Sequence, residues 1–447
     1  MDRREFLKLG LLATSAHFIA QHEPSFIRKS LLPAATRKRI LILGAGLAGL
    51  VAGYELDQAG YEISILEAQM RPGGRVLTLR EPFSDGLYAE AGAGRIPDSH
   101  DLTLHYVRHF GLTLVPFYPD KLSRVFFLGG KRVRVPLWSE VDLTQLPFEF
   151  TTEEKRVGMS GLEQKYLGPA LRNIGDPSAP DWPVGVAKSY DKITMTEFLR
   201  EQGASLGAIQ LLDLPFATAS DDRISFLFNL REAWYASHER TRYKIKGGND
   251  LLPRAFAAKL RENIHYGSPV VRIEQDSTKV RAIALQSGRH HTFEADRLIC
   301  TIPFPALRRV EVQPPFSESK RKAITQLAYD TITRVVLQCR SRYWQQDGCN
   351  GFGISDLEQE IWHPTFDQPG PRGLLVSYMC LSAGQRAGTM DNKKRLEFVS
   401  RDMDKVLPGL RQNLEGVVSK VWHTDPWAGG RHSVAFSRST DVHLCGD

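Results

Sequence analysis

The stretch RILILGAGLAGLVAGYELDQAGYEISILEAQMRPGGRV, residues 39–76, indicates the fold that we expect for this chain. An apolar run, Ile40–Leu43, leads into a glycine turn, and a helical pattern then continues through Ala59. Gly60 stops that helix, and a second strand is expected over Tyr61–Leu66. This order of strand, helix and strand predicts a βαβ unit with parallel strands.

The glycine turn has the spacing of a dinucleotide-binding fingerprint. Gly44 allows a tight turn, Gly46 lets the backbone approach a pyrophosphate, and Gly49 lets the helix pack closely on the strand. Free N–H groups and the helix dipole favour a phosphate at the helix N-terminus. Glu67 ends the second strand and is placed to accept hydrogen bonds from a ribose diol. The expected binding residues are Gly44, Ala45, Gly46, Leu47, Ala48, Gly49 and Glu67. The alternative is a glycine-rich loop in an unrelated α/β domain.

The residues after Glu67 distinguish between NAD and FAD, which share this fingerprint. Ala68 is followed closely by Arg71-Pro72-Gly73-Gly74-Arg75-Val76. Two glycines and an arginine at this place would bring a cationic group and more backbone N–H donors to the pyrophosphate of a bound cofactor. Gly74 and Arg75 therefore favour FAD. A plain surface turn is the alternative.

Length and composition limit the class of protein. A chain of 447 residues is too long for one compact core, so two domains with interleaved segments are expected. No uncharged apolar run of about 18 residues marks a membrane span. The net charge of +7 is dispersed, which argues against a nucleic-acid partner and supports only a mild attraction for acidic substrates. Five scattered cysteines without a CxxC pair predict buried thiols rather than a metal site or a disulfide framework.

The N-terminus is typical of an export signal. Asp2–Lys8 reads DRREFLK, a twin-arginine pair with Phe-Leu-Lys, and Leu9–Ala20 is a short uncharged apolar region. We therefore expect export by the twin-arginine route to a periplasmic or extracellular location. The alternative is a basic amphipathic tail on a cytosolic protein.

The pattern along the chain predicts an α/β fold with a split cofactor domain. Helical patterns dominate roughly 100–115 and 153–240, and strand patterns return around 264–302. We expect a Rossmann-like (GxGxxG) FAD-binding domain formed from discontinuous segments, with an inserted α+β substrate-binding domain. The expected segments are a signal and linker over 1–37, FAD-binding segments over 38–98, 241–312 and 425–447, the last of them incomplete, and substrate-binding segments over 99–240 and 313–424.

Later motifs extend this pattern over nearly all of residues 38–447. They include KGGNDLLPRAFAAKL, SPVVRIEQ, ADRLICTIPFPAL, DPWAGG and a final LCGD. With the glycine motifs, they make the sequence resemble the FAD-dependent amine oxidase superfamily, which includes monoamine and polyamine oxidases, L-amino acid oxidases and tryptophan 2-monooxygenase. The resemblance implies that the backbone of Val270 contacts the adenine end of FAD. It also implies that Trp422 and Trp427 lie near the flavin ring. The alternative for either aromatic residue is ordinary core packing.

Two residues suggest a substrate that carries a carboxylate. The segment Ala91-Gly92-Ala93-Gly94-Arg95-Ile96-Pro97 resembles the GxxRxP segment of L-amino acid oxidases, which implies that Gly94 and Arg95 lie beside the flavin. A guanidinium group is a planar fork suited to a carboxylate. Tyr378 matches the family tyrosine whose hydroxyl helps to hold the same group. The alternative for Arg95 is an ion pair with a structural Asp or Glu.

The sequence departs from the family pattern at two places. Arg334 stands where the family usually has a lysine bonded through water to flavin N5, and a guanidinium group cannot act as a neutral proton shuttle. Arg334 would instead orient a water molecule or raise the flavin redox potential. The chain also ends at the cofactor-binding pair Gly446 and Asp447, where the family pattern continues into a helix that faces the flavin, so FAD affinity depends on whether this chain is a fragment.

The resemblance implies oxidative deamination of an L-amino acid. Hydride would pass from Cα to flavin N5, and oxygen would then be reduced to hydrogen peroxide, while Arg95 and Tyr378 hold the carboxylate. The partners are therefore an amino acid or amine substrate and molecular oxygen. The alternatives are oxidative decarboxylation to an amide, as in tryptophan 2-monooxygenase, oxidation of amines or polyamines, and an inactive truncated remnant.

Overall fold

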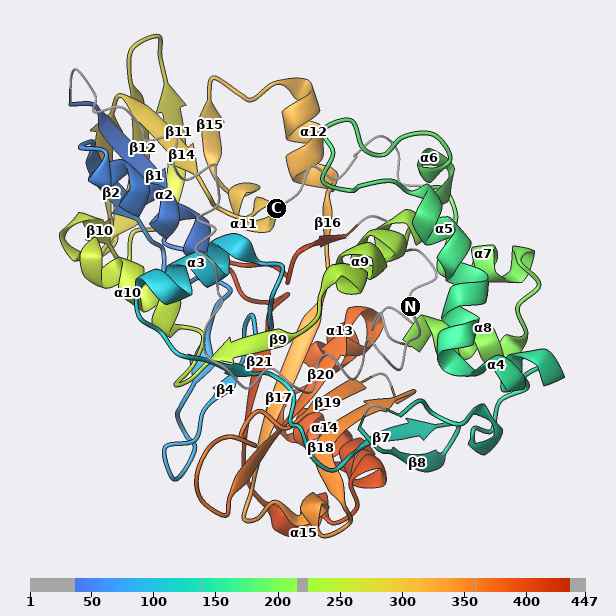
Figure 1. The fold of residues 1–447 in the computed structure, drawn as a ribbon. Coiled ribbons are helices and arrows are strands. Elements are labelled where there is room, and N and C mark those ends of the chain that lie inside the picture. The colour runs from blue at the N-terminus through green and yellow to red at the C-terminus, as the bar shows by residue number, and fades with distance from the viewer. Residues whose placement is uncertain (1–36, 138, 215–223, 358, 435–447) are drawn as a thin grey trace. The chain divides into compact units, whose positions relative to one another are not determined.

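The structure is a computed structural model that describes residues 37–434, except for 138, 215–223 and 358. The twin-arginine segment and the pair Gly446 and Asp447 lie outside the described residues. The boundaries assigned above to the cofactor and substrate segments remain a prediction. Figure 1 shows the arrangement of the elements.

A parallel four-stranded sheet contains the glycine motif. Its strands lie in the order β10 (Ile264–His265), β2 (Glu62–Leu66), β1 (Arg39–Leu43) and β14 (Arg297–Cys300), so segments far apart in sequence lie side by side (Figure 1). Helix α2 (Leu47–Gln58) connects β1 to β2 and confirms the predicted βαβ unit. Alternate apolar residues of β1 and β2 are buried against this helix and α10 (Leu251–Lys259).

The ends of these strands position the candidate site. Leu43 is paired in register with Leu66 on one side and with Cys300 on the other. Because the strands are parallel, the residues that follow them meet at one edge of the sheet. Gly44 and Glu67 are therefore neighbours at that edge, although 23 residues separate them in sequence.

A second four-stranded sheet shares part of its apolar core with the first. It has the order β13 (Arg289–Ala295), β12 (Val280–Gln286), β11 (Val270–Gln275) and β15 (Glu311–Gln313). Its apolar residues Ile273, Ala282 and Ala284 share a core cluster with Leu41 and Leu43 of β1. This shared core fixes the start of β11 beside the edge that carries the glycine turn.

A seven-stranded sheet forms the largest β element. Its order is β21 (Leu414–Val421), β17 (Ile332–Cys339), β20 (Gly373–Cys380), β19 (Gln359–Trp362), β18 (Cys349–Ser355), β7 (Ser123–Leu128) and β8 (Lys131–Val135). Every residue of β17 and β20 is buried. Helices α13 (Leu381–Thr389) and α14 (Asn392–Val406) contribute buried residues to the apolar cluster on one face of the sheet. Its other face carries the charged row described below.

The described part of the segment 99–240 combines helices with three strands. It contains α3 (Asp101–His109), α4 (Thr152–Leu162), α7 (Met195–Glu201), α8 (Leu206–Asp213) and α9 (Phe226–His238), but also the strands β6 (Leu114–Pro116), β7 and β8. The pattern over 100–115 thus ends in a strand. Threonine capping boxes begin α4 and α7, and α4, α7, α8 and α9 bury apolar residues in one cluster.

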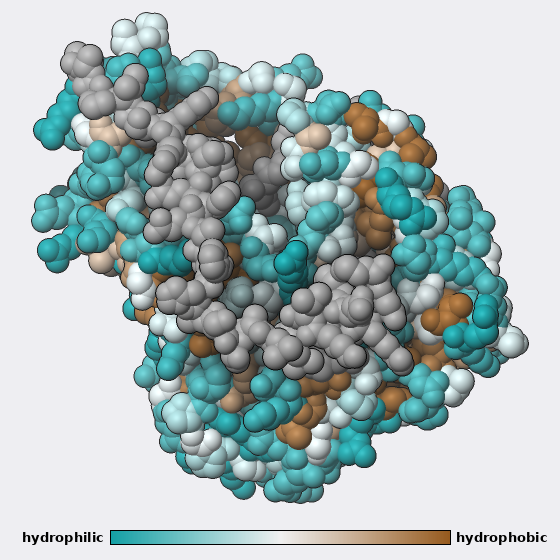
Figure 2. Space-filling model, in the orientation of Figure 1, coloured by the Kyte–Doolittle hydropathy of each residue, from teal (hydrophilic) through white to brown (hydrophobic). Residues whose placement is uncertain are grey.

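The helices and the surface were compared with what a membrane-spanning protein requires. No helix among the described residues combines the length and the apolar character that crossing a bilayer requires. The face drawn in Figure 2 is mostly hydrophilic, and its apolar side chains lie in separate groups.

All four described cysteines are free thiols. Cys339, Cys349 and Cys380 are buried, and Cys300 is exposed.

Candidate active site

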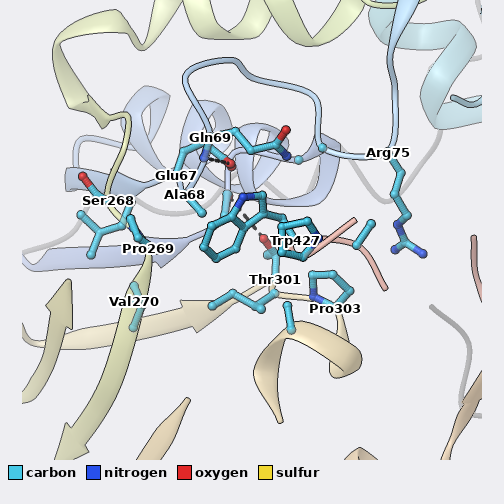
Figure 3. Close-up of a pocket in the computed structure, with 18 of the residues that line it drawn as sticks. Glu67, Ala68, Gln69, Arg75, Ser268, Pro269, Val270, Thr301, Pro303 and Trp427 are labelled. Carbon is cyan, nitrogen blue, oxygen red and sulfur yellow. Dashed lines mark hydrogen bonds between the residues drawn. The ribbon is translucent and has the colours of Figure 1, made fainter. Parts of the chain in front are cut away.

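A cavity of about 680 Å³ lies at the edge of the parallel sheet. Figure 3 shows Arg75 at one end of its lining and Ser268 and Val270 at the other. The predicted cofactor residues that line it are Gly44, Gly46, Leu47, Ala48, Glu67, Ala68, Gly74, Arg75, Val270 and Trp427. The structure therefore brings together residues from four separate motifs.

Glycine suits each of the three fingerprint positions for a different local reason. Gly44 has a φ of 101°, in the left-handed region that favours glycine. A Cβ atom on Gly49 would lie 2.0 Å from the carbonyl oxygen of Gly44, so helix α2 could not approach the turn. A Cβ atom on Gly46 would meet no atom within 4 Å, because Gly46 faces the open cavity.

Glu67 is buried where β2 ends. Its Oε2 accepts a 2.7 Å hydrogen bond from the N–H of Ala45, and its Oε1 accepts a 2.8 Å bond from the N–H of Gln69. Burial raises the pKa of Glu67, while these two donors and the Arg71 guanidinium act in the opposite direction. The carboxylate is thus held rigidly at the cavity wall by the backbone on both sides.

The Gly73-Gly74 turn lies against the fingerprint. The N–H of Gly73 donates to the carbonyl oxygen of Ala45 over 2.8 Å, and a Cβ atom on Gly74 would lie 3.5 Å from Cα of Gly46. Arg71 donates to carbonyl oxygens within the turn and so shapes it. Arg75 lines the cavity and donates to the carbonyl oxygen of Arg431.

The opposite wall contains residues that the sequence did not single out. Thr301 follows β14 at the same edge as Gly44, and its hydroxyl donates to the carbonyl oxygen of Leu43 over 2.8 Å. The Cζ atom of Arg309 lies 5.9 Å from the Trp427 ring centroid. Other unassigned lining residues are Gln69, Ser268, Pro269, Ile302, Pro303 and Pro426. The motifs SPVVRIEQ and LICTIP place Ser268, Pro269, Thr301, Ile302 and Pro303 near strand ends, so the sequence held a signal for these five residues.

The cavity fits a dinucleotide. The first-turn N–H groups of an α-helix have no partner inside the helix. In α2 no side chain caps them. Gly46, Leu47 and Ala48 at this end of the helix line the cavity. A phosphate at this place would accept from those N–H groups. Glu67, a buried acceptor, lies beside it.

A row of charged and hydroxyl side chains crosses the seven-stranded sheet. Arg334 on β17 is paired in register with Lys420 on β21 and with Tyr378 on β20. Tyr378 is in turn paired with Glu360 on β19. Directly opposed residues of neighbouring strands project to the same face, so these four side chains line one face of the sheet.

Arg95 reaches the Glu360 end of this row. Its Nη2 and Nη1 atoms lie 3.4 Å from Oε2 and Oε1 of Glu360, and Nη1 also contacts the hydroxyl of Tyr118 at 3.3 Å. Its Cζ atom lies 4.7 Å from the Trp362 ring centroid. Burial lowers the pKa of Arg95, but Glu360 raises it, and the net change is upward.

Tyr378 is the second predicted carboxylate-binding residue. Its ring stacks on Trp362 with centroids 4.8 Å apart, so Arg95 and Tyr378 both contact this indole. Burial raises the pKa of Tyr378 to about 12. Its hydroxyl accepts from Nη1 of Arg431, a residue that the sequence did not assign although it directly follows DPWAGG.

Arg334 is buried at the centre of the row, with 6% of its surface exposed. Its Nη1 donates to the carbonyl oxygens of Glu90 and Gly92, and its Nε has no partner among the described residues. Burial lowers the pKa of Arg334, but the guanidinium remains protonated.

The cavity lining does not include five of the described residues predicted to bind the cofactor, namely Ala45, Gly49, Gly94, Arg95 and Trp422. Trp422 is buried, and its Nε1 donates a 2.7 Å hydrogen bond to the carbonyl oxygen of Ala91. The carbonyl oxygen of Gly94 accepts from the side chain of Asn249. Trp422 and Asn249 thus hold the segment Ala91–Arg95, while Trp427 alone of the two tryptophans faces the cavity.

Comparison with known proteins identifies the family. The sequence model described as flavin containing amine oxidoreductase matches residues 47–443. This chain belongs to the flavin-containing amine oxidoreductases. A Bacillus subtilis (strain 168) protein named as a candidate L-amino-acid oxidase is 32% identical over 428 residues, which cover 94% of this chain and 88% of that protein. An L-amino-acid oxidase of Naja atra is 26% identical and covers 90% of this chain and 79% of that protein.

Solved structures of this family share the fold. A redesigned putrescine oxidase superposes with a TM-score of 0.75 at 20% identity, covering 90% of this chain and 88% of that one. Cyclohexylamine oxidase from Brevibacterium oxydans gives 0.74 at 18%, with the same coverage. The predicted superfamily, the α/β class and the oxidoreductase assignment are therefore confirmed, and FAD is the cofactor of this family.

Proposed function

We propose that this chain oxidatively deaminates an L-amino acid. One amino acid, one oxygen and one water would yield one 2-oxo acid, one ammonia and one hydrogen peroxide. The observation that carries the proposal is the placement of Arg95 and Tyr378 on the same indole, that of Trp362. A guanidinium and a phenol that contact the same aromatic ring are suited to a carboxylate next to an apolar substrate body.

FAD would be held by residues of the sheet edge. The N-terminus of α2 would receive the pyrophosphate, Glu67 the ribose diol, and Arg75 the phosphate charge. Bound FAD supplies two-electron oxidation and reoxidation by oxygen. Trp427 and Arg309 would cover the cofactor from the opposite wall.

The chain's own residues would orient the substrate. Arg95 would bind the α-carboxylate, and Glu360 would yield part of its contact, because both oxygen contacts are as long as 3.4 Å. The hydroxyl of Tyr378 would donate to the same carboxylate while it accepts from Arg431. Arg334 would hold positive charge without moving a proton, so the α-amine must lose its proton to another acceptor or to water.

Product analysis tests this proposal. Purified protein supplied with FAD is incubated with a panel of L-amino acids and with their decarboxylated amines, and peroxide, 2-oxo acid, ammonia and amide are measured. The proposal predicts peroxide, ammonia and 2-oxo acid in equal amounts from at least one amino acid. An amide without peroxide would indicate a monooxygenase, amine turnover an amine oxidase, and no product an inactive remnant.

We also propose export by the twin-arginine route, on the basis of the motif DRREFLK. A fusion of residues 1–37 to a reporter that is active only after export tests it. Replacement of Arg3 and Arg4 by lysine should abolish the signal.

A further inference from the structure

A turn made of Pro426, Trp427 and Ala428 forms part of the cavity wall. Figure 3 draws the indole of Trp427 among the lining side chains. This indole retains 36% of its exposure, so packing alone does not fix its position. Ala428 is buried and belongs to the same apolar cluster as Trp362 and Tyr378. The turn therefore borders both the cavity and the aromatic cluster that Arg95 contacts.

The carboxylate of Asp425 orders this turn. Its Oδ1 accepts hydrogen bonds from the N–H of Trp427 over 2.9 Å and from the N–H of Ala428 over 3.1 Å. Its Oδ2 accepts from Nζ of Lys420. The side chain retains only 7% of its exposure, so water competes little for these bonds. Since a charged acceptor strengthens each bond, one carboxylate fixes the backbone of two residues of the wall.

Two cationic side chains hold the turn from different parts of the fold. Lys420, the partner of Asp425, lies on β21 and is paired in register with Arg334 on β17. Arg309 lies in the segment between β14 and β15, and it donates to the carbonyl oxygen of Pro426. The turn is thus tied to the seven-stranded sheet through Asp425 and to the cofactor side through Arg309.

A wall that is ordered before the cofactor arrives favours binding, because ordering a loop on association reduces affinity. Asp425 itself is not among the residues that line the cavity. We infer that Asp425 is a positioning residue for FAD, and that it acts through Trp427 and Ala428 rather than by contact with the cofactor. This inference rests on the part of the proposed function that places FAD in this cavity, and it assigns the residue that orders one wall.

Titration of the full chain with FAD, followed by calorimetry, tests this role. Asp425→Ala should weaken FAD binding about tenfold, because two N–H groups lose a charged acceptor. Asp425→Asn keeps an oxygen acceptor for both groups and should weaken binding by less than about threefold. Asp276→Ala is the matched control and should bind FAD like the native chain. Asp276 also accepts from two backbone N–H groups, but in an exposed turn that does not line the cavity.

A double-mutant cycle distinguishes positioning from a general loss of stability. In a Trp427→Ala background, Asp425→Ala should weaken FAD binding by less than about threefold further, because the indole that Asp425 positions is absent. Effects of the two substitutions that multiply would show that they act independently, and would overturn the inference. Circular dichroism checks folding. If Asp425→Ala is unfolded, Asp425→Ser, which supplies a shorter and neutral acceptor, takes its place in the cycle with the same expected result.

Glu67→Gln separates this inference from the cofactor placement on which it rests. Weaker FAD binding in Glu67→Gln with native binding in Asp425→Ala overturns the inference and leaves the cavity as the FAD site. Native binding in both variants overturns the inference together with the placement of FAD. Tight FAD binding that depends on Asp425, without peroxide from any amino acid, supports the inference and overturns only the proposed oxidation.

Discussion

Arg95 and Glu360 face each other fork to fork, with both nitrogen–oxygen contacts at 3.4 Å. Their side chains retain 25% of their exposure, so the pair is accessible to a dissolved ligand. These contacts are longer than the usual charge-assisted hydrogen bond. Glu360 therefore occupies part of the position that a substrate carboxylate would take on Arg95.

Glu360→Gln should lower KM for amino acid substrates several-fold, because the carboxylate that competes for Arg95 becomes neutral. Steady-state kinetics measure the change. Glu397→Gln, at an exposed position on α14, serves as the matched control and should have no effect. A higher KM in Glu360→Gln would show that Glu360 orients Arg95 rather than competes for it.

Gly46→Ala and Gly49→Ala should fail in different ways. A Cβ atom at residue 46 enters open space, so the unfolding of the FAD-free protein should be nearly unchanged while FAD affinity falls by more than about tenfold. A Cβ atom at residue 49 meets a carbonyl oxygen at 2.0 Å, so Gly49→Ala should destabilise the protein by at least roughly 3 kcal/mol. Denaturant unfolding and FAD titration measure the two effects. Equal loss of stability in both variants would contradict this assignment.

Glu67→Gln should weaken FAD binding by roughly tenfold, because a neutral amide is a poorer acceptor for a ribose diol than a carboxylate. Quenching of FAD fluorescence on binding measures the affinity. Glu62→Gln, at an exposed residue on the same strand, should bind FAD like the native chain. If the two variants bind FAD equally well, Glu67 does not contact the cofactor.

Glu90 should give the protein a distinct pH dependence. Burial raises the pKa of this carboxyl group from 4.5 to about 7, against the hydrogen bonds from Asn249 and Thr78. The folded state thus binds the proton more tightly than the unfolded state, so the Glu90 contribution to unfolding free energy falls as pH rises from about 4.5 to about 7.

Glu90→Gln cannot ionise and should lose this dependence. The difference to measure is the unfolding free energy of Glu90→Gln minus that of the native chain. From about pH 4.5 to about pH 8, this difference should increase by up to roughly 3 kcal/mol. Urea unfolding at both pH values gives the difference, in which the titration of the other groups cancels. A difference that stays constant with pH would contradict the role of Glu90.

The local part of the cofactor site could be predicted from sequence. Gly44, Gly46 and Gly49 are fixed by steric limits on backbone and helix approach, and Glu67 by its place at a strand end, so their spacing alone identifies them. Val270 and Trp427 depend on distant motifs and were placed through the family resemblance. Both line the cavity.

The charged row could not be predicted in the same way. Arg334, Tyr378 and Glu360 meet because β17, β20 and β19 adopt one register, and periodicity within a single strand carries no information about its partner. Arg431 was missed because a turn, rather than a regular element, presents it to Tyr378. The strands β7 and β8 were missed because helical patterns dominate the segment around them.

Anaerobic mixing of the FAD-supplied protein with substrate tests the central claim most directly. Loss of visible flavin absorbance is followed after addition of each L-amino acid and of the amine that lacks its carboxylate, in the native chain and in Arg95→Met. We predict bleaching by at least one amino acid, at least about a hundredfold slower bleaching by its amine, and loss of the difference in Arg95→Met. Equal or faster bleaching by the amine, or purified protein that retains no flavin absorbance, would contradict it.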